Sequence, residues 1–355
     1  MTAFEKIVKL TGEKELDAIL ITGRENERWA LGCGPFEGVT FITRTGAGYL
    51  MTDGRYIEKA RELVRGLELL TPDRSAGYAP HVSELAKKHG SKRIGFEDRV
   101  MSVAEFERYR AAMPDCEFVS VSADIAALRQ IKTRKEIECI TAAQRIAERA
   151  LEDMLDIIKP GLTEAALRAE LEYRMKKYGS EGEAFPTILV SGANTSLPHG
   201  KPTDKEVREG EFVTMDFGAR VNGYCSDMTR TVAVGDITDE MRRVYDIVLR
   251  AQRVGIAALH EGAIPDEVDR AARSVIEDEG YGPAFLHGLG HSLGLNVHES
   301  PTTRGREPFP RGTVITMEPG IYLAGRFGVR IEDMIYLGEN GAENLTLAPK
   351  HLVIL

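Results

Sequence analysis

The sequence predicts an α+β fold in two parts: a smaller α/β domain over residues 1–125 and a larger domain over residues 126–355 with an internal repeat. Three observations predict it. The chain of 355 residues is longer than one typical domain. Helical and strand-like patches alternate up to about Asp124, where a long helical stretch takes over. Beyond that stretch, a pattern of glycines and acidic residues occurs twice.

The composition is that of an ordinary globular protein, with 43% hydrophobic and 28% charged residues. The net charge of −9 argues against nucleic acid or an anionic membrane as a partner. The four cysteines form no CxxC pair, which fits a reducing compartment. No signal peptide and no run of ~18 uncharged apolar residues is present. We therefore expect a soluble, cytoplasmic protein.

The first part reads as helices and strands around a mixed sheet, without a glycine-rich phosphate loop. An amphipathic helix opens the chain, and Asp53-Gly54 forms a turn. Strands are expected over residues 16–22, 39–43, 48–52, 93–96 and 117–121, and helices over 55–67, 83–89 and 103–113. We expect Trp29 in the core of this domain.

The stretch 125–155 is rich in Ala, Glu and Arg and predicts a helical connector, with a break near Lys132. Lys159-Pro-Gly161 ends it. We place the domain boundary near residue 125.

The larger part contains the repeat. Gly182-Glu-Ala-Phe185 recurs as Gly282-Pro-Ala-Phe285, and the stretch 210–218 recurs as 312–320. Helical stretches, 163–178 and 265–279, precede the two copies. Each half is therefore expected to be helices followed by strands that carry two carboxylates. Two such halves facing each other would bring four carboxylates together at a pseudo-twofold axis.

The first carboxylate pair is Asp216 and Asp227. Residues 212–219 and 224–233 are strand-like, and Asn222-Gly223 between them is a strong two-residue hairpin signal. That turn places Asp227 opposite Gly218, so the two aspartates become diagonal neighbours on one face. Two acids held this close repel each other unless one is protonated or a cation lies between them.

The second half supplies further ligands. Arg330 and Glu332 share a face of an expected strand over 329–337, and Glu318 precedes Pro-Gly, where its strand ends. His291 adds one imidazole. Four carboxylates with one nitrogen suit Mn²⁺ or Co²⁺, with Zn²⁺ and Fe²⁺ as alternatives. Their charge balances two divalent ions, and such a pair can orient a shared hydroxide as nucleophile.

Other interpretations fit less well. Any one of these acids alone could lie on a solvated strand, but the set recurs at matching points of both repeats. Asp216-Phe-Gly218 resembles a kinase motif without the loops that accompany it. The segment 288–294 has the wrong spacing for GxGxxG, and His287 and His291 lack the glutamate of HExxH.

The set of Asp216, Asp227, His291, Glu318 and Glu332 resembles the five-ligand dinuclear site of the pita-bread metallopeptidases. These include methionine aminopeptidase, aminopeptidase P, prolidase and the metal-independent creatinase. The resemblance covers roughly residues 125–355, through the stretches 185–194, 197–200, 215–219, 226–231, 287–300, 317–322 and 328–333. The stretches 26–32 and 50–56 resemble the smaller creatinase-type domain of the proline-specific members. Methionine aminopeptidases usually lack that domain, so the proline-specific branch is implied.

The resemblance implies a role for each site residue. Asp216 would hold one metal ion, Asp227 and Glu332 would bridge both, and His291 with Glu318 would hold the second. Glu318 is then also the implied general base. His199 and His298 are similar to the substrate-side histidines of the family, His287 to one that lines the substrate pocket, and Arg330 to an arginine that steadies the site. His81, His89, His260 and His351 show no supporting pattern.

The implied reaction is hydrolysis of the bond between an N-terminal residue and a following proline. Apolar pocket walls, with Phe185, Leu293 and Tyr322 as candidates, would suit the ring. Some prolidases carry His-Glu-x-Pro-Arg, whereas here Arg304 follows His298-Glu-Ser-Pro-Thr at a displaced position. Dipeptidase and longer-peptide aminopeptidase therefore both stay open. The resemblance also implies a homodimer.

Two alternative functions do not involve cleavage of a prolyl peptide bond. A scaffold or chaperone-like member of the fold would be expected to lose ligands, and all five are present. A creatinase-like amidinohydrolase should lack the acidic set.

Overall fold

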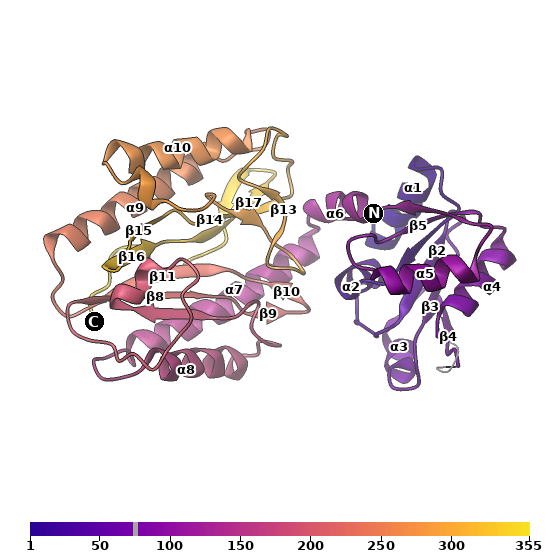
Figure 1. Cartoon of the computed structure of the whole chain (residues 1–355), viewed down its shortest axis with the longest axis horizontal. Helices are drawn as coiled ribbons and strands as arrows, with labels where there is room; N and C mark the ends of the chain where they lie inside the picture. The colour runs from indigo at the N-terminus through magenta and orange to yellow at the C-terminus, as the bar shows by residue number, and fades with distance from the viewer. Residues whose placement is uncertain (74–76) are drawn as a thin grey trace. The chain divides into compact units, whose positions relative to one another are not determined.

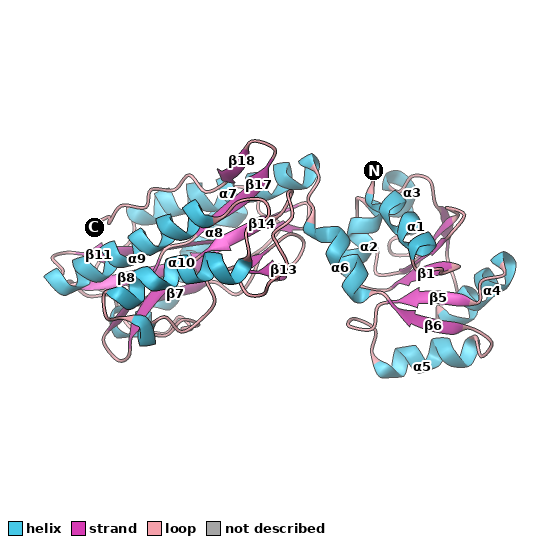
Figure 2. Cartoon of the chain, turned by 90° about the horizontal axis from the view of Figure 1, so that it is seen from above, coloured by secondary structure: helices cyan, strands magenta, loops and turns pink. Residues whose placement is uncertain are grey.

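The computed structural model describes residues 1–73 and 77–355, which form two compact units, Met1–Arg129 and Gln130–Leu355. Figure 1 follows the chain through both units, and Figure 2 shows their helices and strands. The boundary predicted from the sequence lies a few residues earlier, near residue 125. None of the described helices combines the length and apolar character needed to cross a membrane.

The first unit is a six-stranded mixed sheet with helices around it. The strand order is β4-β3-β2-β1-β5-β6, with the antiparallel pairs β1·β2 and β2·β3 and the other pairs parallel. The strands are β1 Ala18–Ile21, β2 Val39–Thr43, β3 Gly48–Met51, β4 Glu68–Leu70, β5 Arg93–Phe96 and β6 Glu117–Ser120. The helices are α1 Ala3–Glu13, α2 Arg24–Leu31, α3 Ile57–Leu63, α4 Ala79–His89, α5 Val103–Ala112 and α6 Ser122–Gln130.

The α/β domain with a mixed sheet is confirmed, and two of its elements are absent from the predicted set. Helix α2 is short and mostly polar, with three buried residues, so it contains few apolar residues from which a helix could be predicted. Strand β4 has three residues, none of them buried, at the edge of the sheet. Trp29, on α2, is buried as expected. Weakly patterned elements such as these acquire their structure from packing.

The second unit contains two sets of helices and strands in the same order. The helices are α7 Arg134–Leu155, α8 Glu164–Lys177, α9 Asp239–Ala258 and α10 Pro265–Asp278. The strands of the first set are β7 Ile188–Ser191, β8 Glu211–Phe217, β9 Arg220–Val221, β10 Tyr224–Cys225 and β11 Met228–Val234. Those of the second are β12 His291–Ser292, β13 Glu299–Thr302, β14 Val314–Met317, β15 Gly320–Leu323, β16 Phe327–Arg330, β17 Asp333–Gly338 and β18 Gly341–Asn344.

The topology repeats as the sequence predicts. Strands β7, β8 and β11 follow α7 and α8 and form one antiparallel ladder; β12, β14 and β17 follow α9 and α10 and form another. Figure 1 shows the strands between the pair α9 and α10 and the pair α7 and α8. Two buried apolar clusters, one on each helix pair, fill the space between helices and strands. Helix α9 is absent from the predicted elements.

The predicted register of the hairpin is confirmed. Asp216 pairs with Thr229 across β8 and β11, and Val221 pairs with Tyr224 beside the turn. Asn222 and Gly223 both have positive φ, 48° and 78°, as the two-residue turn requires. A register slip of one residue would have sent the two aspartates to opposite faces.

The expected continuous strand over 329–337 is wrong. The structure divides it into β16, which pairs with β15, and β17, which pairs with β14. The break falls at Ile331-Glu332, where the backbone N–H of Glu332 donates to the Thr229 carbonyl oxygen, 3.1 Å away. Because the chain leaves one ladder for another at this point, alternation along a single strand does not describe the relation of Arg330 to Glu332.

Candidate metal centre

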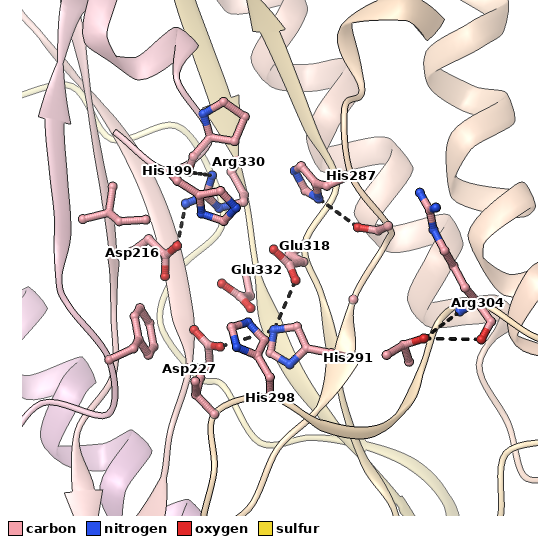
Figure 3. A pocket seen from close by; sticks show the side chains of 17 residues that line it. His199, Asp216, Asp227, His287, His291, His298, Arg304, Glu318, Arg330 and Glu332 are labelled. Carbon is pink, nitrogen blue, oxygen red and sulfur yellow. Dashed lines mark hydrogen bonds and ion pairs between the residues drawn. The ribbon is translucent and has the colours of Figure 1, made fainter. Parts of the chain in front are cut away.

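The candidate site is a pocket of about 350 Å³ in the second unit. Its walls combine the acidic and imidazole side chains of both repeats with a few apolar groups. The lining residues are Phe185, Ile188, Pro198, His199, Asp216, Asp227, His287, Gly288, Gly290, His291, Val297, His298, Thr302, Arg304, Glu318, Arg330 and Glu332. Figure 3 shows Asp227, His291, Glu318 and Glu332 pointing toward one another, with Asp216 beside them.

The first repeat brings two aspartates to this pocket. Asp216 lies near the end of β8, and Asp227 lies between β10 and β11. Gly218 allows the two strands to come this close, because a Cβ there would stand 1.9 Å from the Ser226 carbonyl oxygen. The Ala219 N–H donates to Ser226 Oγ at 3.0 Å and closes the hairpin beside the pair.

The second repeat brings two glutamates. Glu318 follows β14 directly, and its backbone N–H donates to the Leu289 carbonyl oxygen at 2.9 Å. Glu332 lies in the break between β16 and β17 and accepts a hydrogen bond from Thr229 Oγ1 at 2.7 Å. Since Thr229 belongs to the first repeat, this hydroxyl joins the two halves at the pocket.

His291 presents one nitrogen to the carboxylates. Its Nδ1 lies 3.1 Å from the Ser292 carbonyl oxygen, which assigns the ring proton to Nδ1. Its Nε2 then carries a lone pair, 3.4 Å from Glu318 Oε1 and 3.7 Å from Asp227 Oδ2. Ligand atoms of Asp227, His291 and Glu332 lie within 4.8 Å of one another, close enough to share one ion.

Burial makes the charges of this cluster costly. Desolvation, followed by the charges of neighbouring carboxylates, raises the pKa of Asp227 and of Glu332 well above their usual range. Desolvation raises the pKa of Glu318 to about 8. Burial also lowers the pKa of His291 to about 4, so the imidazole is neutral at pH 7. Acids that hold their protons because they lack a counter-charge, beside a neutral imidazole, suit a cation.

An unused acceptor in the same cluster supports that fit. Asp216 Oδ2 accepts from Arg330 Nη2 at 2.6 Å, while its buried Oδ1 has no hydrogen-bond partner among the described residues. A buried oxygen of this kind normally has a partner. The four carboxylates with His291 therefore fit divalent metal, through oxygen ligands and one nitrogen.

Arg330 organises the wall beside Asp216. It is buried, and it donates to Asp216, to the Tyr322 hydroxyl at 2.8 Å and to Thr229 Oγ1 at 3.0 Å. Burial alone would lower its pKa, but the nearby acidic groups Tyr322, Asp216 and Glu318 together raise it. Arg330 is thus held as a fixed positive charge at one end of the cluster.

His287 lines the pocket with both ring nitrogens engaged. Nδ1 lies 2.8 Å from the Gly288 carbonyl oxygen, and Nε2 lies 2.8 Å from the Tyr322 hydroxyl. Helix α10 holds this loop, because Arg273 donates to the His287 carbonyl oxygen at 2.7 Å. Burial lowers the pKa of His287 to about 4. The ring is therefore neutral and points its edge at Tyr322.

His199 and His298 are exposed at the pocket. The ring centroid of His298 lies 4.4 Å from that of His291, in an edge-on arrangement. Figure 3 shows His199 on the side of Arg330 and His298 on the side of Asp227. Exposed imidazoles on two sides of a buried acidic cluster can both reach a bound molecule.

The other residues weighed from the sequence fall into two groups, those that line the pocket and those that do not. Phe185 and Arg304 line the pocket, whereas His81, His89, His260 and His351 do not. Leu293 is wrong as a pocket wall: it is fully buried in an apolar cluster with Ile140 and Val314. Strand β12 ends at Ser292, so the alternation that would place Leu293 on the face of His291 does not continue to it.

Sequence reasoning missed the hydroxyls that hold the ligands. Thr229 binds Glu332 and Arg330, and Thr316 Oγ1 accepts from the His291 N–H at 3.0 Å. A signal was present: Thr229 lies two residues after Asp227, and Thr316 lies two residues before Glu318. Period-two spacing places such pairs on one face of a strand.

Comparison with known proteins places this architecture in a family. Residues 138–339 match the family model described as metallopeptidase family M24. Residues 4–131 match the model described as the creatinase/prolidase N-terminal domain.

Individual relatives match over almost the whole chain. An Xaa-Pro dipeptidase of Pyrococcus furiosus is 35% identical, over 98% of this chain and 99% of its own. The solved structure of an Xaa-Pro dipeptidase from Bacillus anthracis has a TM-score of 0.95 and 36% identity, over 99% of each chain. That of an X-Pro aminopeptidase from Thermotoga maritima has a TM-score of 0.92 and 35% identity, over 99% of this chain and 100% of its own.

Proposed function

The chain belongs to metallopeptidase family M24, and we propose that it is an Xaa-Pro dipeptidase with two divalent metal ions. The class of reaction is supported by relatives named Xaa-Pro dipeptidase and prolidase over nearly the full chain. The pita-bread fold with its creatinase-type N-terminal domain agrees with this class. The single observation that favours dipeptides is Arg304 in the wall of the pocket that contains the carboxylates.

We assign the five ligands to two ions by their resemblance to the family site. By that resemblance Asp216 would hold one ion, Asp227 and Glu332 would contribute to holding both, and His291 with Glu318 would hold the other. The support for this is the convergence of the side chains, the unpartnered Asp216 Oδ1 and the raised pKa values of the buried acids. When bound, such ions polarise a carbonyl oxygen and lower the pKa of water.

Glu318 is the proposed proton carrier. Desolvation raises its pKa to about 8 without a cation, so this buried carboxylate is a stronger proton acceptor than an exposed glutamate. It takes a proton from the attacking water and delivers it to the prolyl nitrogen as the peptide bond breaks. A prolyl nitrogen in a peptide bond has no hydrogen of its own, so it leaves as an amine only after protonation.

Three other side chains orient the substrate. His298 and His199, exposed on two sides of the cluster, donate to the scissile carbonyl region as negative charge develops there. His287 forms part of the substrate wall through its ring, because both of its nitrogens are engaged. Arg330 holds Asp216 and Tyr322 in place.

Arg304 is the proposed clamp for the proline carboxylate. Its backbone exchanges hydrogen bonds of 3.3 Å with Thr302 Oγ1, while its exposed guanidinium has no hydrogen-bond or ion-pair partner among the described residues. Arg330, the other arginine of the pocket wall, is already paired with Asp216. A free guanidinium at the pocket suits a substrate carboxylate through paired hydrogen bonds.

The test compares cleavage of Ala-Pro, Ala-Pro-NH₂ and Ala-Pro-Ala-Ala with Mn²⁺ or Co²⁺, with Met-Ala-Ser as the substrate that lacks proline. Ala-Pro should be cleaved best. In Arg304→Gln the KM for Ala-Pro should rise about 10- to 100-fold, the effect of losing a hydrogen bond to a charged group. The KM for Ala-Pro-NH₂ should not change, because it has no carboxylate. Arg306→Gln, outside the pocket wall on the same exposed segment, is the matched control.

The second candidate is aminopeptidase P, favoured by the Thermotoga maritima structure titled X-Pro aminopeptidase. Cleavage of Ala-Pro-Ala-Ala at least as fast as Ala-Pro would decide for it. Metal binding without cleavage of either proline substrate would decide for an inactive, scaffold-like protein.

Three finer properties remain predictions from the sequence: Mn²⁺ or Co²⁺ as the native metal, a homodimer, and a cytoplasmic location. Activity after reconstitution with single metals, and the mass of the protein in solution, test the first two.

A further inference from the structure

Lys132 is a buried charge in the segment that connects α6 to α7. Its side chain is 1% exposed, and its backbone N–H donates to the Gly312 carbonyl oxygen at 2.8 Å. Its Nζ lies 3.2 Å from Glu299 Oε2 and 3.4 Å from Ser292 Oγ. A buried ammonium is tolerated only with such partners.

The two partners stand next to the site histidines in the chain. Ser292 follows His291 on β12, and Glu299 follows His298 at the start of β13. These strands pair Ser292 with Glu299 and His291 with Thr302, so the register shifts between the two pairs. Such a bulge interrupts the backbone ladder. Lys132 therefore bridges the two strands where their own hydrogen bonding is irregular.

Glu299 in turn supports the loop that carries His298. Its Oε1 accepts from the Asn296 N–H at 3.1 Å. Gly294 leaves room for the carboxylate, because a Cβ there would stand 2.8 Å from Glu299 Oε2. The Glu299 carboxylate thus lies against the loop on one side and the Lys132 ammonium on the other. A displacement of Glu299 would move His298 and the imidazole of His291 in contact with it.

We propose that Lys132 is a positioning residue, whose ammonium ties Ser292 to Glu299 across the bulge and so sets the orientation of His291 and His298. The inference rests on the proposed function, since it gives those two histidines their roles. Lys132 is not part of the pocket wall, so its proposed effect on the site is transmitted by Ser292 and Glu299.

The second unit offers a matched control. Lys205 Nζ lies 3.0 Å from Ser191 Oγ and 2.6 Å from Glu211 Oε2, the same three side-chain types. Its partners are on β7 and at the start of β8, and none of the three lines the pocket. Lys205→Met removes an ion pair of this kind without touching the histidine loop.

The experiment compares the full-length wild type with Lys132→Met, Lys132→Met/Glu299→Gln and Lys205→Met. Thermal unfolding, Mn²⁺ affinity by calorimetry, and kcat and KM for Ala-Pro are measured. The single variant should lose thermal stability, because the buried Glu299 carboxylate loses the ammonium beside it. The double variant should recover stability, because the buried pair is now neutral. Both should lose about 10- to 100-fold in kcat and in Mn²⁺ affinity, as when a metal ligand loses its support.

The outcomes separate positioning from stability. If Lys132→Met does not fold, kcat and Mn²⁺ affinity are compared between the wild type and the double variant only. Wild-type kcat and Mn²⁺ affinity in a folded protein without Lys132 would overturn the proposal, and so would an equal loss of kcat in Lys205→Met. If the wild type itself fails to cleave Ala-Pro, the proposed function is wrong, and Mn²⁺ affinity still decides whether Lys132 supports His291.

Discussion

Asp227 illustrates what single residues contribute to this site. It is buried, it lies 3.7 Å from His291 Nε2, and desolvation with the charges of Glu332 and its neighbours raises its pKa. An acid in this position is stable either as a protonated carboxyl or as a ligand of a cation. The same holds for Glu332, so the ligands of this site oppose folding until metal binds.

Asp227→Asn should abolish metal occupancy and activity while the protein still folds. The amide keeps the shape of the side chain but removes the charge that would attract an ion. Metal content by mass spectrometry and cleavage of Ala-Pro measure the two effects, and circular dichroism measures the fold. Asp278→Asn, on the exposed end of α10, serves as control. A fully active Asp227→Asn protein would refute the assignment.

Among the elements, the hairpin of β8 to β11 carries the most information. The turn Asn222-Gly223 sets the register of the whole hairpin. The pairing that begins with Val221 and Tyr224 beside the turn continues in register to the pair of Asp216 and Thr229. Register here follows from turn type, which is local and readable in the sequence. The break between β16 and β17 has a different cause, since the chain changes partners there, and neighbouring strands are not visible in local periodicity.

Gly218→Ala should impair metal binding more than it impairs folding. A Cβ at this position would meet the Ser226 carbonyl oxygen at 1.9 Å, so the strands beside Asp216 and Asp227 must move apart. We expect at least about a 10-fold weaker Mn²⁺ affinity, the lower end of the range for displaced support of a ligand. Gly12→Ala, on helix α1 with nothing within 4 Å, is the control and should leave affinity unchanged. Equal affinity in the Gly218 and Gly12 variants would contradict the role of this close approach.

At the scale of the whole molecule, the acidic cluster couples metal binding to stability. Apolar clusters on helices α7 and α8 and on helices α9 and α10 pack on the two sides of the strands that carry it. Arg230 and Lys350 neutralise the neighbouring buried Asp333, and Arg330 pairs with Asp216. Among the described residues, the carboxylates of Asp227, Glu318 and Glu332 have no such cation within ion-pair distance, apart from His291 if it were protonated.

Metal-free protein should therefore lose stability between about pH 7 and pH 8. The folded pKa of Glu318 is about 8, above its usual value of 4.5, and those of Asp227 and Glu332 are raised as well. In this window the folded state binds more protons than the unfolded state, so the free energy of unfolding falls as pH rises. The lowered pKa values of His287 and His291 act in the opposite direction, mainly below about pH 7, where unfolded histidines still bind protons.

Urea unfolding of chelator-treated protein at both pH values measures this change. Saturating Mn²⁺ should remove the decrease, because ligands bound to metal carry no proton in either buffer. Higher stability of the metal-free protein at the upper pH would contradict the acidic cluster as the source.

Much of the architecture and the membership of the site could be predicted from the sequence. The N-terminal sheet, the repeated half and the hairpin register follow from local periodicity, glycine turns and internal similarity. Helix α2 and strand β4 could not be predicted in this way, because both are short and bury few residues or none. The hydroxyl partners Thr229 and Thr316 could be predicted only in part: period-two spacing puts them on the right face, but their acceptors lie far away in the sequence.

The sequence by itself determined which residues could form the centre, because residue type, repeat spacing and one hairpin turn are local properties. Tertiary structure alone decided what surrounds them. Leu293 lies in the core although it stands beside pocket residues, and His287 has both nitrogens engaged by Gly288 and Tyr322. Lys132 reaches Ser292 and Glu299, which stand next to His291 and His298 far along the chain. Burial, pKa and hydrogen-bond partners depend on which segments pack together, and packing is a property of the folded chain as a whole.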